Sequence, residues 1–146
     1  MEKIIPNPAK FRRAQGGATL LEAMVGILIF SLGILALVGM QALAIKQVND
    51  AKYRADASFF ANQIIGEMWV NRTNLANYAY AGGGGPPAVL ANWVTAVQNG
   101  LPGIGGAVNQ PTVAVAGTTV TVTVFWQPPA ATAPHNHITI AYINSN

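Results

Sequence analysis

The longest pattern in the chain is an apolar run, Ala23 to Ile45, that carries no charged side chain and is interrupted only by Ser31 and Gln41. A bilayer core about 30 Å thick needs roughly 20 apolar residues in a helix, and this run supplies them. The pattern therefore predicts a helix over residues 18–45 that can span a membrane. One carboxylate, Glu22, stands at its front edge, where a charge on an apolar span needs a reason.

Residues 46–72 keep a helical spacing but mix apolar with charged positions. Their apolar residues recur at intervals of three and four, which is the periodicity of an amphipathic helix. We therefore expect the first helix to continue through this segment, to end near residues 71–74, and to pack on a globular head. Two apolar rows are expected on it: Val48, Ala51, Ala55 and Phe59 in the first, and Phe60, Ile64 and Met68, with Ile65 and Trp69 beside them, in the second.

The second half of the chain has the pattern of a small head of mixed structure. Glycine and proline clusters at residues 82–87 and 101–106 mark loops. Between them, Ala88–Gln98 has the pattern of a short helix, started by Pro87 and stopped by Gly100. Its buried side is expected to hold Val89, Leu90, Trp93, Val94 and Val97.

Three alternating segments rich in β-branched residues predict an antiparallel meander at the end of the chain. A tight hairpin turn at Gly117-Thr118 joins the first two. The predicted fold class is α+β, in which a long N-terminal helix, transmembrane in its first half, packs on a small antiparallel sheet. The expected strands are Thr112–Ala116, Thr119–Trp126 and Ile138–Ile143; Val120, Val122, Val124 and Trp126 share one face of the second, and Ile138, Ile140 and Tyr142 share one face of the third.

Charge is distributed unevenly along the chain. Residues 1–16 carry one acid and four basic residues, and basic residues flank the cytoplasmic end of a span, so we expect the N-terminus inside and the head outside. From residue 17 onward four basic and four acidic residues cancel, so the calculated pI of about 9.5 is no argument for nucleic-acid binding. No charged residue follows Arg72, and such a surface resists association poorly, which indicates packing against partners.

Candidate chemistry in the head is sparse. The chain has no cysteine, which excludes disulfides, thiol catalysis and thiolate metal sites. His135 and His137 stand two apart near the third strand, would share a face, and would present two metal ligands. No acid follows Arg72 to complete a metal shell or to support a histidine base, so we expect a polar loop edge, no metal or other cofactor, and no enzyme. The tryptophans are expected in the core rather than on a sugar- or partner-binding surface: Trp69, Trp93 and Trp126.

The segment Gly17-Ala18-Thr19-Leu20-Leu21-Glu22, behind a basic leader and before a full span, resembles the class III signal of type IV prepilins. The resemblance implies that a prepilin peptidase cuts after Gly17 and methylates the new N-terminus at Ala18. It also implies that Glu22 pairs with the amine of Ala18 on a neighbouring subunit, which neutralises both charges in an apolar filament core. A pair within one chain is also open, since residues four apart are neighbours on a helix. Without the resemblance, Glu22 is a carboxylate at the level of the lipid headgroups, favoured by the helix dipole.

Residues 16–74 as a whole resemble PilV-type minor pilins, in the stretch Leu32–Gln41 and in the helix end between Ala61 and Arg72. The resemblance implies an inner-membrane protein with a periplasmic head that primes pilus assembly and sits at the pilus tip. Its implied partners are prepilin peptidase, other minor and major pilins, inner-membrane lipids and a tip adhesin. The implied divisions are a leader over 1–17, a membrane and filament-core helix over 18–45, an amphipathic helix over 46–72 and a head over 73–146.

Two alternatives stay open on the sequence. A minor pseudopilin of a type II secretion system would share the signal and the architecture. A membrane-anchored binding module that is never cleaved would share the span and the head, but would keep its leader.

Overall fold

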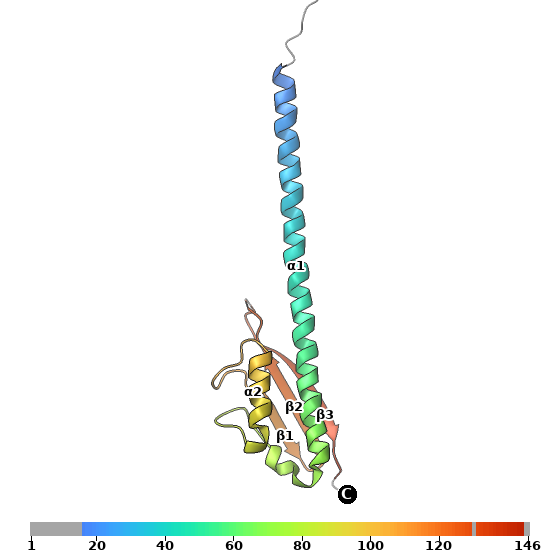
Figure 1. The fold of residues 1–146 in the computed structure, drawn as a ribbon, viewed down its shortest axis with the longest axis vertical. Coiled ribbons are helices and arrows are strands. Elements are labelled where there is room, and N and C mark those ends of the chain that lie inside the picture. The colour runs from blue at the N-terminus through green and yellow to red at the C-terminus, as the bar shows by residue number, and fades with distance from the viewer. Residues whose placement is uncertain (1–15, 130, 145–146) are drawn as a thin grey trace, which may run out of the picture. The chain divides into compact units, whose positions relative to one another are not determined.

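The computed structural model describes residues 16–129 and 131–144, so the basic leader expected over residues 1–17 lies outside the described range except for its last two residues. The chain forms two units, Met1–Ala44 and Ile45–Asn146, and we call the second the head unit. Figure 1 shows the elements along the chain. They are α1 (Gly16–Val70), the 3₁₀ helices η1 (Arg72–Tyr78) and η2 (Ala88–Leu90), α2 (Ala91–Gly100), and the strands β1 (Thr112–Ala116), β2 (Thr119–Trp126) and β3 (His135–Tyr142).

The first unit is, over its described residues, the N-terminal part of α1. Every side chain from Gly17 to Ala44 is exposed, because no other element of this unit packs on it. A helix that is apolar all round is stable only where something other than water surrounds it. The expectation of a long apolar helix from residue 18 is confirmed. Its exposed apolar side chains need lipid or other protein chains around them.

In the head unit, α1 buries one of the two apolar rows expected from the sequence. Ile64, Ile65 and Met68 of the second row are buried, and Phe60 packs against them. The expectation that the first row also packs on the head is wrong: Phe59 is 65% exposed, and Val48, Ala51 and Ala55 are exposed as well. At about 100° per residue the two rows lie on nearly opposite sides of the helix, so one sheet cannot cover both.

Helix α1 ends at Val70, directly before the segment 71–74 in which the sequence predicts its end. The 3₁₀ helix η1 that follows was not predicted. Asn71 joins its two ends, since the Asn71 side-chain amide donates to the Tyr78 hydroxyl oxygen at 3.2 Å. Leu75 and Tyr78 of η1 are buried in the core. These two side chains anchor a segment whose other residues are mostly polar and exposed.

The short helix predicted over Ala88–Gln98 is confirmed as two consecutive pieces, η2 and α2. Leu90, Trp93, Val94 and Val97 are buried as expected, whereas Val89 is 42% exposed. Gly100 closes α2 against α1: a Cβ added there would lie 2.7 Å from Cζ of Phe60. The ring of Phe60 therefore occupies the space that a side chain at residue 100 would fill.

The three strands form an antiparallel sheet in the order β1-β2-β3. The bounds predicted for β1 and β2 are confirmed, and Gly117 supplies the hairpin turn with a positive φ of 61°. Strand β3 begins at His135, three residues before its predicted start, because His135 still pairs with Trp126 at the end of β2. Pairing therefore runs through a polar stretch that carries no strand signal of its own.

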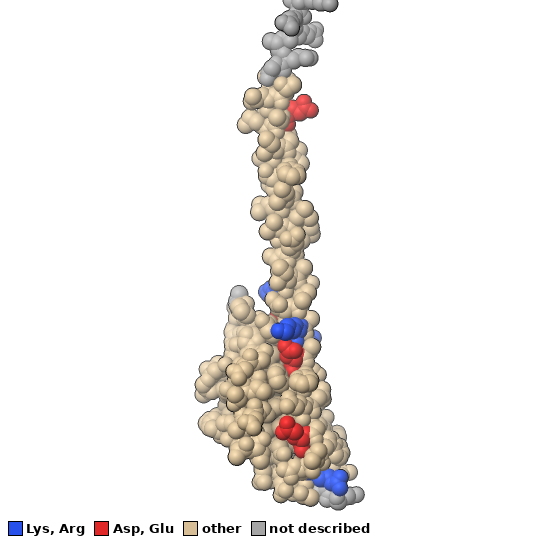
Figure 2. Space-filling view, viewed as in Figure 1, with Lys and Arg blue, Asp and Glu red and all other residues tan. Residues whose placement is uncertain are grey.

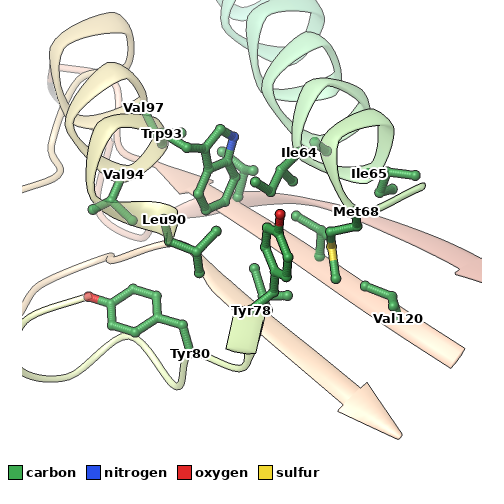
Figure 3. Close-up of a cluster of buried hydrophobic side chains, with 14 of the residues drawn as sticks. Ile64, Ile65, Met68, Tyr78, Tyr80, Leu90, Trp93, Val94, Val97 and Val120 are labelled. Carbon is green, nitrogen blue, oxygen red and sulfur yellow. The ribbon is translucent and has the colours of Figure 1, made fainter. Parts of the chain in front are cut away.

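The core lies between one face of the sheet and the two helices. The green end of α1 and α2 lie alongside one another over the sheet (Figure 1). Figure 3 shows side chains of both helices converging with Tyr78, Tyr80 and the β2 residue Val120. Alternate β2 residues face this core and are buried: Val120, Val122, Val124 and Trp126. The expected α+β, pilin-like layout of a long helix packed on a small antiparallel sheet is confirmed.

Candidate functional site

The three residues singled out from the sequence lie together on the first turns of α1. Gly17, Ala18 and Glu22 are all helical and exposed. Ala18 and Glu22 are four residues apart, which places them one above the other on the same side of the helix. Among residues 16–129 and 131–144, Glu22 has no ion pair or hydrogen bond, so within this part of the chain its carboxylate is available to a group from elsewhere.

The part of α1 behind these residues presents a continuous apolar surface. Phe30 is 69% exposed and Leu35 is 68% exposed. Among the described residues one helix is long and apolar enough to cross a membrane by length and composition, and its most apolar stretch is not buried. A contiguous apolar surface of this size marks contact with lipid or with other proteins. Figure 2 shows this stretch without charge below its first turns.

One polar residue inside this surface is satisfied within the helix. The Ser31 hydroxyl donates to the main-chain carbonyl oxygen of Ile27 at 2.7 Å. A serine bonded back to the preceding turn removes its donor from the surroundings. Ser31 therefore does not interrupt the apolar character of the segment.

The charged side chains of the head unit all come from α1 and the start of η1, and Figure 2 shows them gathered there on an otherwise uncharged face. Within the described residues none of them forms an ion pair with another. Two open grooves lie beside this charged stretch, one between α1 and β3 and the other between α1 and the loop that precedes β3. One, of about 630 Å³, is lined by Gln47, Asp50, Arg54, Ser58 and two alanines of α1 and by His137.

The second groove, of about 300 Å³, brings Asp50 and Lys46 to the neighbourhood of His135. An acid therefore lies near both histidines, although none follows Arg72 in the sequence. Sequence reasoning missed this relationship because it depends on how α1 packs against a strand that begins 85 residues after Asp50. No spacing along the chain signals it.

The histidines themselves are engaged with neighbouring strand residues. His137 Nε2 lies 3.1 Å from the Thr139 hydroxyl, and the His135 ring stacks on Trp126 with centroids 5.7 Å apart. No hydrogen bond joins Asp50 to either ring among the described residues, and no group of three potential metal ligands occurs among them. The arrangement therefore offers neither a general base held by a carboxylate nor a metal shell.

The tryptophans divide between core and surface. Trp93 and Trp126 are buried, as expected. Trp69 is 46% exposed, so its expected place in the core is wrong. It follows Met68 by one residue, which turns it by about 100° away from the buried face of α1.

Comparison with known families gives one match. Residues 12–38 match the prokaryotic N-terminal methylation motif, a segment that includes Gly17, Ala18 and Glu22. No curated protein and no solved structure matches the chain significantly. The motif is the signal of type IV prepilins, and together with the apolar helix it supports a membrane-anchored protein of the pilin and pseudopilin type.

Proposed function

We propose that this chain is a minor type IV pilin of the PilV type, made as a prepilin and processed at its N-terminus. The match of residues 12–38 to the methylation motif carries the prepilin part of this proposal, and the resemblance of residues 16–74 to PilV-type minor pilins supplies the rest. The exposed apolar surface of α1 supports it, because a filament subunit needs such a helix both in the membrane and in the assembled fibre.

In this account a prepilin peptidase cuts the Gly17–Ala18 peptide bond and methylates the amine released on Ala18. The basic leader holds the N-terminus in the cytoplasm before the cut, and the head lies in the periplasm. After the cut the leader charges are gone. The Ala18 amine and the Glu22 carboxylate then remain as the two charges at the apolar end of α1.

These two charges give the apolar helix a register within a filament. An unpaired charge in an apolar core costs several kcal/mol, so a subunit that enters the fibre is most stable where its Glu22 meets an Ala18 amine. The rest of the apolar surface then exchanges lipid contacts for contacts with neighbouring helices. The head stays outside this core, where it joins other minor pilins in a complex that primes assembly and remains at the tip, with an adhesin as a further partner.

A gene deletion tests the pilus role in cells that make this protein naturally. Loss of the gene is expected to reduce the number of surface pili recovered by shearing, and to leave secretion through any type II system unchanged. Expression of the full chain from a plasmid restores the pili. Loss of secretion with normal pili would contradict the proposal and indicate a pseudopilin, and no change in either would indicate an anchored binding module.

A further inference from the structure

Strand β3 is an edge of the sheet, and its hydrogen-bonding pattern can be read from one bond at its end. The Ile143 amide donates to the Thr118 carbonyl oxygen at 2.7 Å. In an antiparallel pair, residues alternate between those bonded to the partner strand and those whose N–H and C=O point away from it. Counting back along the register from Ile143, Ala141, Thr139 and His137 are bonded to β2.

The intervening residues of β3 therefore direct their backbone N–H and C=O groups away from the sheet. Beyond the β2 ladder, none of them makes a backbone hydrogen bond with another described residue. These four residues are also the ones whose side chains lie on the sheet face opposite the helices. They are Asn136, Ile138, Ile140 and Tyr142.

This edge carries none of the features that normally prevent another strand from pairing with it. Natural edge strands are usually short, charged, interrupted by proline or bulged. Strand β3 pairs over eight residues without a bulge and contains no charged residue and no proline. The opposite edge differs: Val113 of β1 exchanges two backbone hydrogen bonds with Tyr80, both of 2.8 Å.

The surfaces on either side of the β3 edge would suit a further strand. On the outer face Ile138 is 54% exposed, Ile140 57% and Tyr142 70%, so alternate side chains of an added strand would pack on an apolar row. On the inner side lies the larger groove beside α1, with Asp50 and Arg54 on its wall. The remaining side chains of the added strand, which alternate with those on the outer face, would point into this groove.

We propose that β3 binds an extended segment of another protein, which adds to the sheet as a fourth strand. The unpaired backbone groups identify the occupant as a strand, because a helix or a lipid chain cannot satisfy them. The segment would alternate apolar β-branched or aromatic residues on its outer face with small or ion-pairing residues toward Asp50 and Arg54. The outer face of the sheet carries no charged residue. Uncharged side chains on the outer face of the added strand would therefore match it.

A second copy of this chain fits the edge less well. Lys46 lies beside His135, so the chain enters the head unit near the beginning of β3. Two copies paired antiparallel through β3 would place these entry points at opposite ends of the pair. If both apolar segments enter one membrane, as the proposed function requires, the separation of these entry points counts against a second copy as the partner.

Site-specific photo-crosslinking in cells that make the protein naturally tests the proposal on the full chain. A photoreactive amino acid replaces Ile140 in one variant and Ala114 in the control. Ala114 stands in the same cross-strand row as Ile140, with Thr121 of β2 between them, and is also exposed. We expect at least tenfold more crosslinking to a different protein from position 140 than from position 114, with the crosslink mapped to an extended segment.

A second substitution shows whether the backbone edge is responsible. Ile138→Pro removes an outward N–H while keeping the bonds of Thr139 and Ala141 to β2, since proline is tolerated on the free side of an edge strand. It should lower crosslinking from position 140 at least tenfold. Slow amide exchange at Thr139 and Ala141 in the detergent-purified variant checks that the sheet is intact. Ile140→Lys, with the photoreactive residue moved to Tyr142, gives an independent block if the proline variant does not fold.

The proposal is overturned by equal yields at positions 114 and 140, or by no crosslink at 138, 140 or 142. It is also overturned if the crosslink persists in a folded Ile138→Pro variant, or if it joins only lipid or a second copy of the chain. The test does not depend on the leader being cleaved. A failure here is therefore distinct from a failure of the pilin proposal, which the mass of the N-terminus decides.

Discussion

The indole nitrogen of Trp93 donates a hydrogen bond to the main-chain carbonyl oxygen of Phe60 at 2.9 Å. This bond joins α2 to α1 across 33 residues of chain, and it satisfies the one polar atom of a side chain that is otherwise buried in the core. Buried side chains of both helices belong to one apolar cluster, so this bond adds a directional contact to packing that has no direction of its own.

Trp93→Phe removes this bond and part of the ring. We expect the free energy of unfolding of the head unit to fall by roughly 1–3 kcal/mol, from the lost hydrogen bond and the small cavity. Thermal unfolding of the full chain in detergent, followed by near-ultraviolet circular dichroism, measures the change. Trp69→Phe is the matched control, because Trp69 is exposed, and it should change the stability by less than about 0.5 kcal/mol. Equal effects of the two substitutions would contradict the assigned packing.

The close approach at Gly100 predicts a destabilising alanine. Gly100→Ala would bring a Cβ within 2.7 Å of Phe60, and the cost of such overpacking is about 1–3 kcal/mol of unfolding free energy. Gly66 on α1 is the control, since a Cβ there meets nothing within 4 Å. Gly66→Ala should stabilise the helix by about 0.5–1 kcal/mol. The same unfolding measurement compares them, and a neutral Gly100→Ala would show that the ring of Phe60 moves aside freely.

Substitution of Gly17 tests the position of the cleavage. Gly17→Val should leave the full chain in the membrane but block removal of the leader, because the peptidase must reach the main chain at the bond it cuts. Co-expression with a prepilin peptidase, followed by electrophoretic mobility, gives the readout. Gly16→Ala, one residue earlier, should still be cut. Cleavage of both variants would place the cut elsewhere.

Glu22→Ala tests the proposed charge pair. The variant should still insert in the membrane, because the apolar segment is unchanged, but its amount in sheared pili should fall at least about tenfold. An unpaired amine costs several kcal/mol in an apolar core, and 1.4 kcal/mol already corresponds to a factor of ten. Glu67→Ala removes an exposed acid of the head unit and should have no such effect. Wild-type amounts of the Glu22 variant in pili would refute the pairing.

The sequence predicts most of the secondary structure because the signals are local. The alternation in β1 and β2 and Gly117 in the hairpin each act within a few residues, and the bounds of both strands are confirmed. The apolar run predicts a long helix, and α1 confirms that helix. The sequence does not determine which apolar surface of an amphipathic helix packs against the rest of the protein. Both apolar rows of α1 have helical spacing, but only packing against the sheet decides that Ile64 is buried and Phe59 is not.

The same limit applies to β3 and to the grooves beside it. His135 lies in a strand because Trp126 pairs with it, and Asp50 lies near His137 because α1 crosses that strand. Neither relationship leaves a mark in the spacing of residues. The residues proposed for processing are different, since Gly17, Ala18 and Glu22 lie close together along the chain, within the segment that matches the N-terminal methylation motif.

The central claim is that the chain is a processed prepilin, and the intact mass of the membrane-extracted protein tests it most directly. The protein should be taken from cells that have their own prepilin peptidase. We predict the mass of residues 18–146 plus one methyl group, with fragmentation placing that group on the amine of Ala18. The mass of the full 146-residue chain would contradict the claim and leave an anchored protein whose leader is retained.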